Sequence, residues 1–350
     1  MNRRIDALRK TLSDGECVFI SSYPNIFYFS KFTSGDAYLI ISHDKTVIIT
    51  DSRYTVQAKE QCPDFEIWDI SKGIAAAFDE FSENTVFYEE KDISVGFYIN
   101  LKKRCTTKTF VPASDKISIF RRIKDKDEIK TIHQAEQLGD LAFEHIIKII
   151  KPGMTEIEVA TELEYFLRKN GALKLSFDTV AASGYRSSMP HGVASKKEIK
   201  NGEFLTLDFG CILDGYCSDM TRTVAVGYIS EQEKEVYDIV LKAQEEALKQ
   251  MKIGMKCSEI DGIARNIITK AGYGENFGHS LGHSVGIEIH EAPNFSSKSP
   301  DVFAEGNVIT VEPGIYIDNH FGVRIEDVVA AVDGEIINLT SSPKELIIIN

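Results

Sequence analysis

The first part of the chain alternates short apolar runs of strand length with a segment of helical pattern. Three runs are predicted strands: Glu16–Ser21, Ala37–Ile41 and Thr85–Tyr88. Lys45–Thr50 follows a turn signal, so it is predicted to pair with Ala37–Ile41 as a hairpin. Asp51 can cap a helix over Asp51–Glu60. Residues 1–120 therefore predict an α/β domain of ordinary size.

A charged segment, residues 121–127, separates this domain from a second one that we assign to residues 121–350. From Asp127 to Ile150 the apolar residues return every three or four positions, which is typical of an amphipathic helix. The sequence Lys-Pro-Gly at 151–153 is expected to end that helix.

The second region contains an internal repeat. KPGMTEIE at 151–158 resembles KIGMKCSEID at 252–261, and FLTLDFG at 204–210 resembles VITVEPG at 308–314. The two pairs are separated by nearly the same number of residues. We interpret them as a duplicated α+β unit whose two halves would face each other across a cleft.

Composition narrows the class of protein. The chain has 350 residues with 43% hydrophobic and 27% charged residues, which is typical of a globular protein of two domains. The net charge of −13 makes a nucleic acid an unexpected partner. None of the apolar runs is long enough to span a membrane. Six cysteines without a C-x-x-C pair predict reduced thiols and a cytoplasmic location.

A first predicted hairpin places two acids together. Asp208 lies on the outgoing strand and Asp219 on the returning strand, with the Asp214–Gly215 turn between them. Side chains alternate along a strand, so both carboxylates are expected on one face. For this hairpin alone, two solvent-facing acids would be the simpler interpretation. Cys217 shares that face, and a buried packing thiol is its expected role.

A second hairpin repeats the arrangement. Glu312 ends the predicted strand Val308–Glu312, and Glu326 lies on the returning strand Gly322–Ala330, with Asp327 pointing the other way. Four carboxylates in one cleft would repel one another and lose hydration, so some would stay protonated. Divalent cations offset that cost, and with His283 the oxygen-rich set is suited to hard or borderline metals. A pair of such metals indicates hydrolytic chemistry.

Histidines gather in two glycine-containing segments. GHSLGHSVGIEIHEAP at 278–293 holds His279, His283 and His290, and its glycines predict a loop followed by a strand over Val285–His290. AASGYRSSMPHG at 181–192 reads as a loop that carries His191, which is either a turn residue or a proton-handling group.

These motifs resemble the creatinase-fold, or pita-bread, metallopeptidases, and among them prolidase and aminopeptidase P. The resemblance covers nearly the whole chain and is strongest over residues 121–350. It is carried by SGYRSSMPHG at 183–192, LDFGCILDGYCSDMTRT at 207–223, GHSLGHSVGIEIHEAP at 278–293, VEPGIY at 311–316 and GVRIEDVV at 322–329. It implies an α/β (α+β) fold with an N-terminal creatinase-type domain and a C-terminal catalytic domain of pseudo-two-fold symmetry.

The resemblance also implies a metal centre. Two divalent ions, with Mn²⁺ as the leading expectation and Co²⁺, Zn²⁺ or Fe²⁺ as alternatives, would be held between the two halves. A hydroxide between them would attack the peptide carbonyl. Asp208 would bind one ion, and Asp219 and Glu326 would bridge both. His283 and Glu312 would hold the other.

Further roles follow from the same resemblance. Glu312 would also handle the proton of the nucleophile. His191 and His290 would steady the oxyanion or the leaving proline nitrogen. His279 would line the pocket near the proline, and Arg324 would support Glu326 from behind.

The resemblance predicts hydrolysis of the Xaa-Pro bond of dipeptides or short peptides by a homodimer. An aminopeptidase P acting strictly on longer peptides is the main alternative. Methionine aminopeptidase lacks the first domain, and creatinase lacks the metal-ligand set. A non-catalytic, peptide- or protein-binding member of the fold would be expected to have lost ligands, and all five are retained here.

Overall fold

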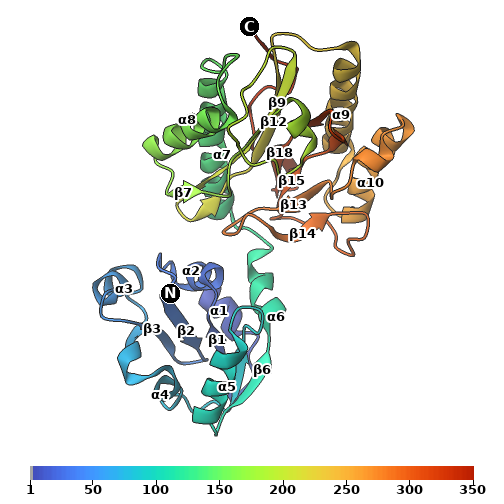
Figure 1. Ribbon diagram of the computed structural model, residues 1–350. Coiled ribbons are helices and arrows are strands. Elements are labelled where there is room, and N and C mark those ends of the chain that lie inside the picture. Colours follow the sequence, from blue (N-terminus) through green and yellow to red (C-terminus); the bar gives the residue numbers. More distant parts are fainter. Residues whose placement is uncertain (1–2) are drawn as a thin grey trace. The chain divides into compact units, whose positions relative to one another are not determined.

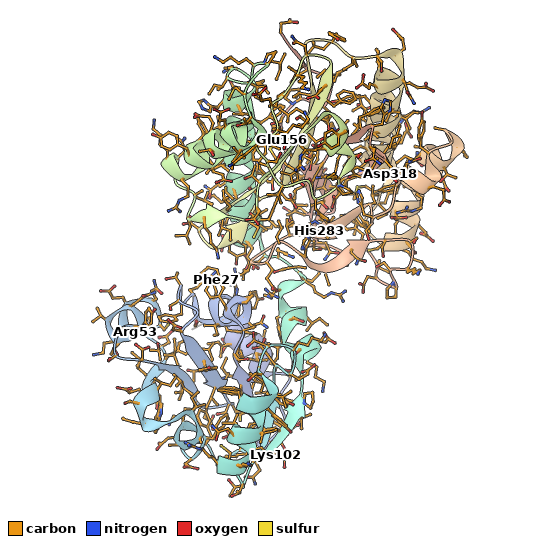
Figure 2. The ribbon with its side chains drawn as sticks, viewed as in Figure 1. Phe27, Arg53, Lys102, Glu156, His283 and Asp318 are labelled. Atoms are coloured by element: carbon orange, nitrogen blue, oxygen red, sulfur yellow. The ribbon has the colours of Figure 1, made fainter. Side chains whose placement is uncertain are left out.

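The computed structural model describes residues 3–350 and divides into two compact units, Met1–Arg121 and Arg122–Asn350 (Figure 1). Figure 2 shows their side chains, with Arg53 and Lys102 labelled in the first unit and Glu156 and His283 in the second. Within residues 3–350, no helix has the length and apolar character needed to cross a bilayer.

The first unit is built on one mixed sheet of order β4-β3-β2-β1-β5-β6. The antiparallel pairs are β1 with β2 and β2 with β3, and the other neighbours run parallel. The predicted hairpin is therefore confirmed. The strands are β1 (Glu16–Ile20), β2 (Ala37–Ile41), β3 (Thr46–Thr50), β4 (Glu66–Asp69), β5 (Thr85–Tyr88) and β6 (Thr109–Pro112).

Helices flank this sheet and bury a shared apolar core that includes Phe19, Ile40, Phe78 and Leu101. The helices are α1 (Arg3–Arg9), α2 (Tyr23–Ser30), α3 (Thr55–Gln61), α4 (Ile74–Phe78), α5 (Val95–Arg104) and α6 (Ser114–Ser118), with 3₁₀ turns at Ile70–Lys72 and Ile119–Arg121.

The helix predicted from Asp51 begins later, at Thr55. Asp51 Oδ1 accepts a hydrogen bond from the backbone N–H of Arg53, and the same carboxylate pairs with the Arg53 guanidinium. Asp51 therefore closes a local turn instead of capping the helix, which is a common alternative for this residue type.

The second unit repeats one arrangement of two helices and an antiparallel strand pair. In its first half, α7 (Lys126–Ile146) and α8 (Glu156–Lys169) pack on β8 (Val180–Ser183), β9 (Glu203–Phe209) and β12 (Met220–Val226). In its second half, α9 (Glu231–Gln250) and α10 (Cys257–Lys270) share a core with β15 (Val308–Val311) and β18 (Asp327–Val332). Figure 1 shows the two helix pairs flanking the strands.

Backbone details support the predicted duplication. Gly153 and Gly254 both adopt positive φ, at 91° and 94°. The N–H of Gly153 donates to Ile199 O at 2.9 Å, and that of Gly254 donates to Phe303 O at 2.8 Å. Each glycine lies three residues before a helix of 14 residues, α8 or α10. The two halves are thus folded alike at their matching positions.

The strands of this unit form two main sheets, ordered β20-β12-β9-β8 and β14-β13-β15-β18-β19. Two smaller sheets are β11-β10-β7 and β16-β17. The remaining elements are β7 (Lys174–Leu175), β10 (Cys211–Leu213), β11 (Tyr216–Cys217), β13 (Gly282–Ser284), β14 (Glu291–Phe295), β16 (Gly314–Ile317), β17 (Phe321–Arg324), β19 (Glu335–Asn338) and β20 (Ile348–Ile349), with 3₁₀ turns at Gly184–Ser188 and Gly274–Asn276.

The predicted helix over Asp127–Ile150 is observed as α7, which begins and ends earlier. Asp125 caps it, and Asp125 and Glu128 form a reciprocal capping box. This cap explains the earlier start, since Asp125 satisfies the first backbone N–H groups.

Candidate metal centre

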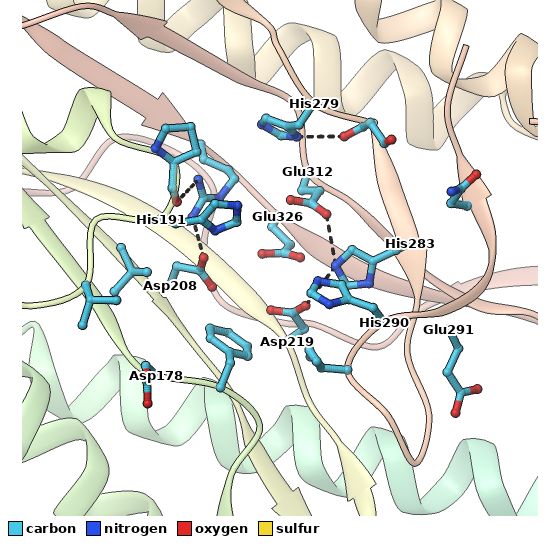
Figure 3. A pocket seen from close by; sticks show the side chains of 18 residues that line it. Asp178, His191, Asp208, Asp219, His279, His283, His290, Glu291, Glu312 and Glu326 are labelled. Atoms are coloured by element: carbon cyan, nitrogen blue, oxygen red, sulfur yellow. Dashed lines mark hydrogen bonds and ion pairs between the residues drawn. The ribbon is translucent and has the colours of Figure 1, made fainter. Parts of the chain in front are cut away.

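A pocket of about 580 Å³ lies in the second unit where the two main sheets meet. Figure 3 shows carboxylates and imidazoles from both halves pointing toward one another at its centre. The titratable residues among those lining it are Asp178, His191, Asp208, Asp219, His279, His283, His290, Glu291, Glu312, Arg324 and Glu326.

Asp208 enters the pocket from β9. It stands opposite Thr221 in the antiparallel ladder that β9 forms with β12. Its Oδ2 accepts a hydrogen bond from Arg324 Nη2. Its Oδ1 is buried and has no hydrogen-bond partner among residues 3–350. A buried carboxylate oxygen without a donor is costly, so this atom is available to a cation.

Asp219 and Glu326 sit where strands begin, one residue before β12 and β18 respectively. Glu136 Oε1 accepts a hydrogen bond from the Asp219 backbone N–H at 2.8 Å, and Thr221 Oγ1 donates to Glu326 Oε2 at 2.6 Å. Burial, followed by the negative charge of neighbouring acids, raises the pKa of both carboxyls well above the ordinary range. The pair therefore keeps a proton unless positive charge arrives.

His283 lies on β13, and Glu312 follows β15. Nε2 of His283 is 3.5 Å from Asp219 Oδ2 and 3.4 Å from Glu312 Oε1. The other ring nitrogen, Nδ1, is 3.3 Å from the carbonyl oxygen of Ser284, which can only accept a hydrogen bond. Nδ1 therefore carries the proton, and Nε2 presents its lone pair to the acids, as in metal-binding histidines. Burial lowers the pKa of His283, which favours this neutral form.

The donor set is suited to divalent cations. One donor atom from each of Asp219, His283 and Glu326 lies within 4.8 Å of the other two. Burial raises the pKa of Glu312 to about 7, despite the opposing charge of Arg324. A bound cation would replace the missing hydration of these carboxylates, ionise them and partner the unsatisfied Oδ1 of Asp208.

The strand predicted over Val285–His290 is wrong. The strand in this segment is β13, Gly282–Ser284, followed by bends up to His290 and then by β14. Gly282 was expected to loosen the chain. It lies instead inside the strand, where a Cβ would stand only 1.8 Å from Thr310 O. Glycine is therefore needed at this position. A register shift between His283 and Ser284 then turns the chain out of the ladder.

His191 and His290 both face the pocket. The ring centroid of His290 lies 4.3 Å from that of His283, edge to face. Burial, together with the nearby rings of His283 and His191, lowers the pKa of His290. His290 is therefore a neutral donor or acceptor at physiological pH.

His279 lines the pocket, and both of its ring nitrogens are engaged within the protein. Nδ1 is 2.8 Å from Ser280 O, and Nε2 is 2.9 Å from the hydroxyl of Tyr316. Burial lowers the pKa of His279 to about 4, so the ring is neutral. Nδ1 donates to the carbonyl, and Nε2 accepts from Tyr316. The ring is thereby held in one orientation and presents its faces and carbon edges to the cavity.

Arg324 contacts Asp208 as well as the residues that lead to Glu326. Its Nη2 binds Asp208, its Nη1 donates to the Tyr316 hydroxyl at 2.7 Å, and its Nε donates to Thr221 Oγ1 at 3.1 Å. Glu326 is reached indirectly, through Thr221. The reason is geometric, since Arg324 ends β17, which contacts β9, the strand that carries Asp208.

Sequence reasoning missed three residues that support the site. Thr221 shares a strand face with Asp219, so strand alternation alone could have indicated it. Tyr316 lies within the VEPGIY segment, and the pattern of that segment gives no reason to single it out. Glu136 is a fully buried acid in the middle of α7. The amphipathic pattern of the helix does not indicate which other element this acid binds.

Comparison with known proteins decides the family. Residues 130–333 match the model described as metallopeptidase family M24, and residues 4–123 match the creatinase/prolidase N-terminal domain. The chain belongs to metallopeptidase family M24. The fold class and the resemblance inferred from the sequence are thereby confirmed, as is the assignment to metallopeptidases.

Similar M24 proteins include dipeptidases and an aminopeptidase. An Xaa-Pro dipeptidase of Pyrococcus horikoshii is 40% identical over 95% of this chain and 94% of its own. The solved structure of an Xaa-Pro dipeptidase from Bacillus anthracis has a TM-score of 0.95 at 42% identity and covers 99% of both chains. That of an X-Pro aminopeptidase from Thermotoga maritima MSB8 has a TM-score of 0.92 at 38% identity, again with 99% coverage of both chains.

Proposed function

We propose that this M24 enzyme hydrolyses the Xaa-Pro bond of dipeptides or short peptides. The observation that carries the proposal is the convergence of five metal-binding side chains, from both halves of one domain, on a pocket that also holds His191 and His290. The similar dipeptidases and aminopeptidase indicate the substrate class.

Asp208, Asp219, His283, Glu312 and Glu326 would hold two divalent cations, with Mn²⁺ as the leading candidate and Co²⁺, Zn²⁺ or Fe²⁺ as alternatives. Bound cations of this kind supply Lewis acidity and lower the pKa of water, so that a nucleophile is available at neutral pH. The oxygen-rich donor set with one imidazole nitrogen supports this choice of metals.

The side chains around the cations would handle protons. Glu312 lines the pocket, and burial raises its pKa to about 7, which supports a role in accepting the proton of the nucleophile. His191 and His290 stand at the cavity wall and would donate hydrogen bonds to the oxyanion or to the leaving proline nitrogen. His279, held by Tyr316 and Ser280, would present a fixed surface to the proline ring.

A pocket of about 580 Å³ is suited to a dipeptide or to the first residues of a longer peptide. We favour dipeptides or short peptides, and strict action on longer peptides is the alternative. We further propose that the catalytic domain comprises residues 121–350 behind an N-terminal domain of residues 1–120. A cytoplasmic homodimer is the proposed working form.

Hydrolysis of Ala-Pro and of Ala-Pro-Ala, each measured with Mn²⁺ and with a chelator, tests the proposal. We expect Mn²⁺-dependent release of alanine from Ala-Pro at least. Turnover of Ala-Pro-Ala alone would replace the dipeptidase assignment with the aminopeptidase P assignment. Turnover of neither peptide by protein that has bound two Mn²⁺ ions would contradict both.

A further inference from the structure

A second charged cluster lies behind the metal centre, and its central residue is Arg222 on β12. Arg222 is 1% exposed. Its Nε donates to Pro343 O at 2.9 Å, Nη1 donates to Thr221 O at 2.9 Å and to Glu326 O, and Nη2 donates to Asp327 Oδ1 and Ser342 O, both at 2.7 Å. All five N–H groups of the guanidinium are thus used.

Arg222 joins the two main sheets next to two candidate metal ligands. It lies three residues after Asp219 on β12, and it binds the backbone carbonyl of Glu326 itself. Its carboxylate partner Asp327 is the first residue of β18. Because β12 and β18 belong to different main sheets, the guanidinium spans the junction from which Asp219 and Glu326 enter the pocket.

Arg222 is not the only donor that compensates the negative charge of Asp327. Asp327 Oδ2 also accepts hydrogen bonds from Gln244 Nε2 at 2.9 Å, Asn338 Nδ2 at 2.8 Å and Lys344 Nζ at 3.0 Å. Loss of the Arg222 guanidinium would therefore leave Asp327 with a cation and two amide donors. This arrangement lowers the cost to folding of a substitution at Arg222.

A segment near the C-terminus, residues 340–344, connects Arg222 with the residue that holds Asp219. Ser342 and Pro343 accept hydrogen bonds from Arg222. Thr340 Oγ1 donates to Glu136 Oε2 at 3.2 Å, and Glu136 Oε1 accepts the Asp219 N–H at 2.8 Å. One segment thus anchors the backbone contacts of both Asp219 and Glu326.

We propose that Arg222 is a positioning residue which, together with the 340–344 segment and Glu136, fixes the separation of the Asp219 and Glu326 carboxylates so that both can hold the same cation pair. The inference rests on the proposed function, in which these two acids are the shared ligands. Without such a brace, the ends of β12 and β18 that carry the two carboxylates would be free to shift relative to each other. A role confined to stability would leave the affinity for cations unchanged in the folded protein.

The test uses Arg222→Lys in the full-length protein, because lysine keeps the charge and cannot reach five acceptors. The matched control is Arg122→Lys, the same change at an ion pair with Asp301, because neither residue lines the pocket. Mn²⁺ binding is measured by calorimetry, and the spin-coupled signal of a Mn²⁺ pair is measured by electron paramagnetic resonance. Circular dichroism establishes that each variant is folded.

We expect Arg222→Lys to raise the dissociation constant of the weaker Mn²⁺ ion about 10- to 100-fold and to reduce the spin-coupled signal at equal loading, with Arg122→Lys unchanged. A folded Arg222→Lys protein with wild-type affinity and signal would overturn the proposal. A wild-type protein that binds fewer than two Mn²⁺ ions would instead overturn the metal assignment, and this inference with it.

Thr340→Val and Thr340→Ser test the same brace independently of Arg222. Thr340→Val removes the hydroxyl that binds Glu136 and should weaken Mn²⁺ binding, whereas Thr340→Ser should restore it. If Arg222→Lys does not fold, wild-type Mn²⁺ affinity in Thr340→Val overturns the proposal. Failure of both variants to fold would also overturn it, because the cluster would then serve the fold as a whole.

Discussion

Arg324 binds one oxygen of Asp208 and leaves the other oxygen of the same carboxylate buried, with no donor among residues 3–350. The guanidinium therefore orients Asp208 without using up its capacity to bind. It also brings positive charge beside Glu312 and Glu326, whose carboxyls are both buried in the pocket. A single side chain thus prepares an acidic cavity for a cation that must enter from solvent.

Replacement of Asp208 or Glu326 by alanine is expected to abolish tight Mn²⁺ binding and peptidase activity together, since each removes a donor that nothing nearby can replace. Calorimetry with Mn²⁺ and hydrolysis of Ala-Pro measure the two effects. Asp178→Asn is the matched control, because Asp178 lines the same pocket and is exposed. A fully active variant at Asp208 with two bound ions would contradict the assignment.

His191→Ala and His290→Ala should leave Mn²⁺ binding intact and lower kcat by about 10²–10⁴-fold, the usual range for loss of a proton-handling group. His320→Ala, on an exposed turn, serves as the control and should behave as wild type. A wild-type rate in either pocket variant, measured with Mn²⁺-loaded protein, would remove that histidine from the mechanism.

Tyr316→Phe removes a hydroxyl that donates to His279 Nε2 and accepts from Arg324 Nη1. We expect kcat/KM to fall about 2- to 10-fold, corresponding to one or two lost hydrogen bonds, with folding retained. Tyr185→Phe is the control, since Tyr185 is 49% exposed. An unchanged kcat/KM would show that the hydroxyl has no part in orienting His279 or Arg324 for reaction.

The contribution of Glu312 to the stability of the metal-free protein should be lost as the pH rises from about 4.5 to 7. Burial raises the pKa of Glu312 to about 7, whereas the group in the unfolded chain has its ordinary pKa of 4.5. In this range the folded state holds a proton that the unfolded state has released, so the free energy of unfolding falls with rising pH.

Thermal melts of chelated protein across this pH range measure the effect. Glu312→Gln should show a smaller decline, because it lacks the titrating group, and saturating Mn²⁺ should reverse the trend by binding the ionised carboxylates. A change of melting temperature with pH that is the same in the chelated wild type and in Glu312→Gln would contradict the raised pKa of Glu312.

Much of this architecture could be predicted from local patterns. The β2–β3 hairpin follows from apolar runs around a turn, and the duplication follows from echoed segments, because both depend on residues close in sequence. The predicted strand Gly322–Ala330 is wrong, since the chain forms β17 and β18 there with Glu326 between them. The acids were nevertheless predicted to converge, because strand alternation favoured one face of each hairpin, although only Asp208 lies within a strand. The exact pairing of β9 with β12 was not predicted: Asp208 pairs with Thr221, and Asp219 lies just beyond the ladder.

What could not be predicted depends on close approach between distant segments. Gly282 lies in a strand at a point where Thr310 O comes close to its Cα, and no pattern of neighbouring residues indicates that contact. Glu136 and Arg222 each bind backbone atoms of another element, so their roles become visible only when the sheets are assembled. The contact of Arg324 with Asp208 was not predicted, for the same reason.

If the five proposed ligands hold cations, their spread over separate stretches of both half-domains links the lifetime of the protein to its supply of metal. A cation that binds the folded chain alone, at about one hundred times its Kd, adds about 2.7 kcal/mol to the free energy of unfolding. Proteases in a cell act largely on opened molecules. A cell poor in the metal would therefore hold fewer copies of this enzyme as well as less active ones.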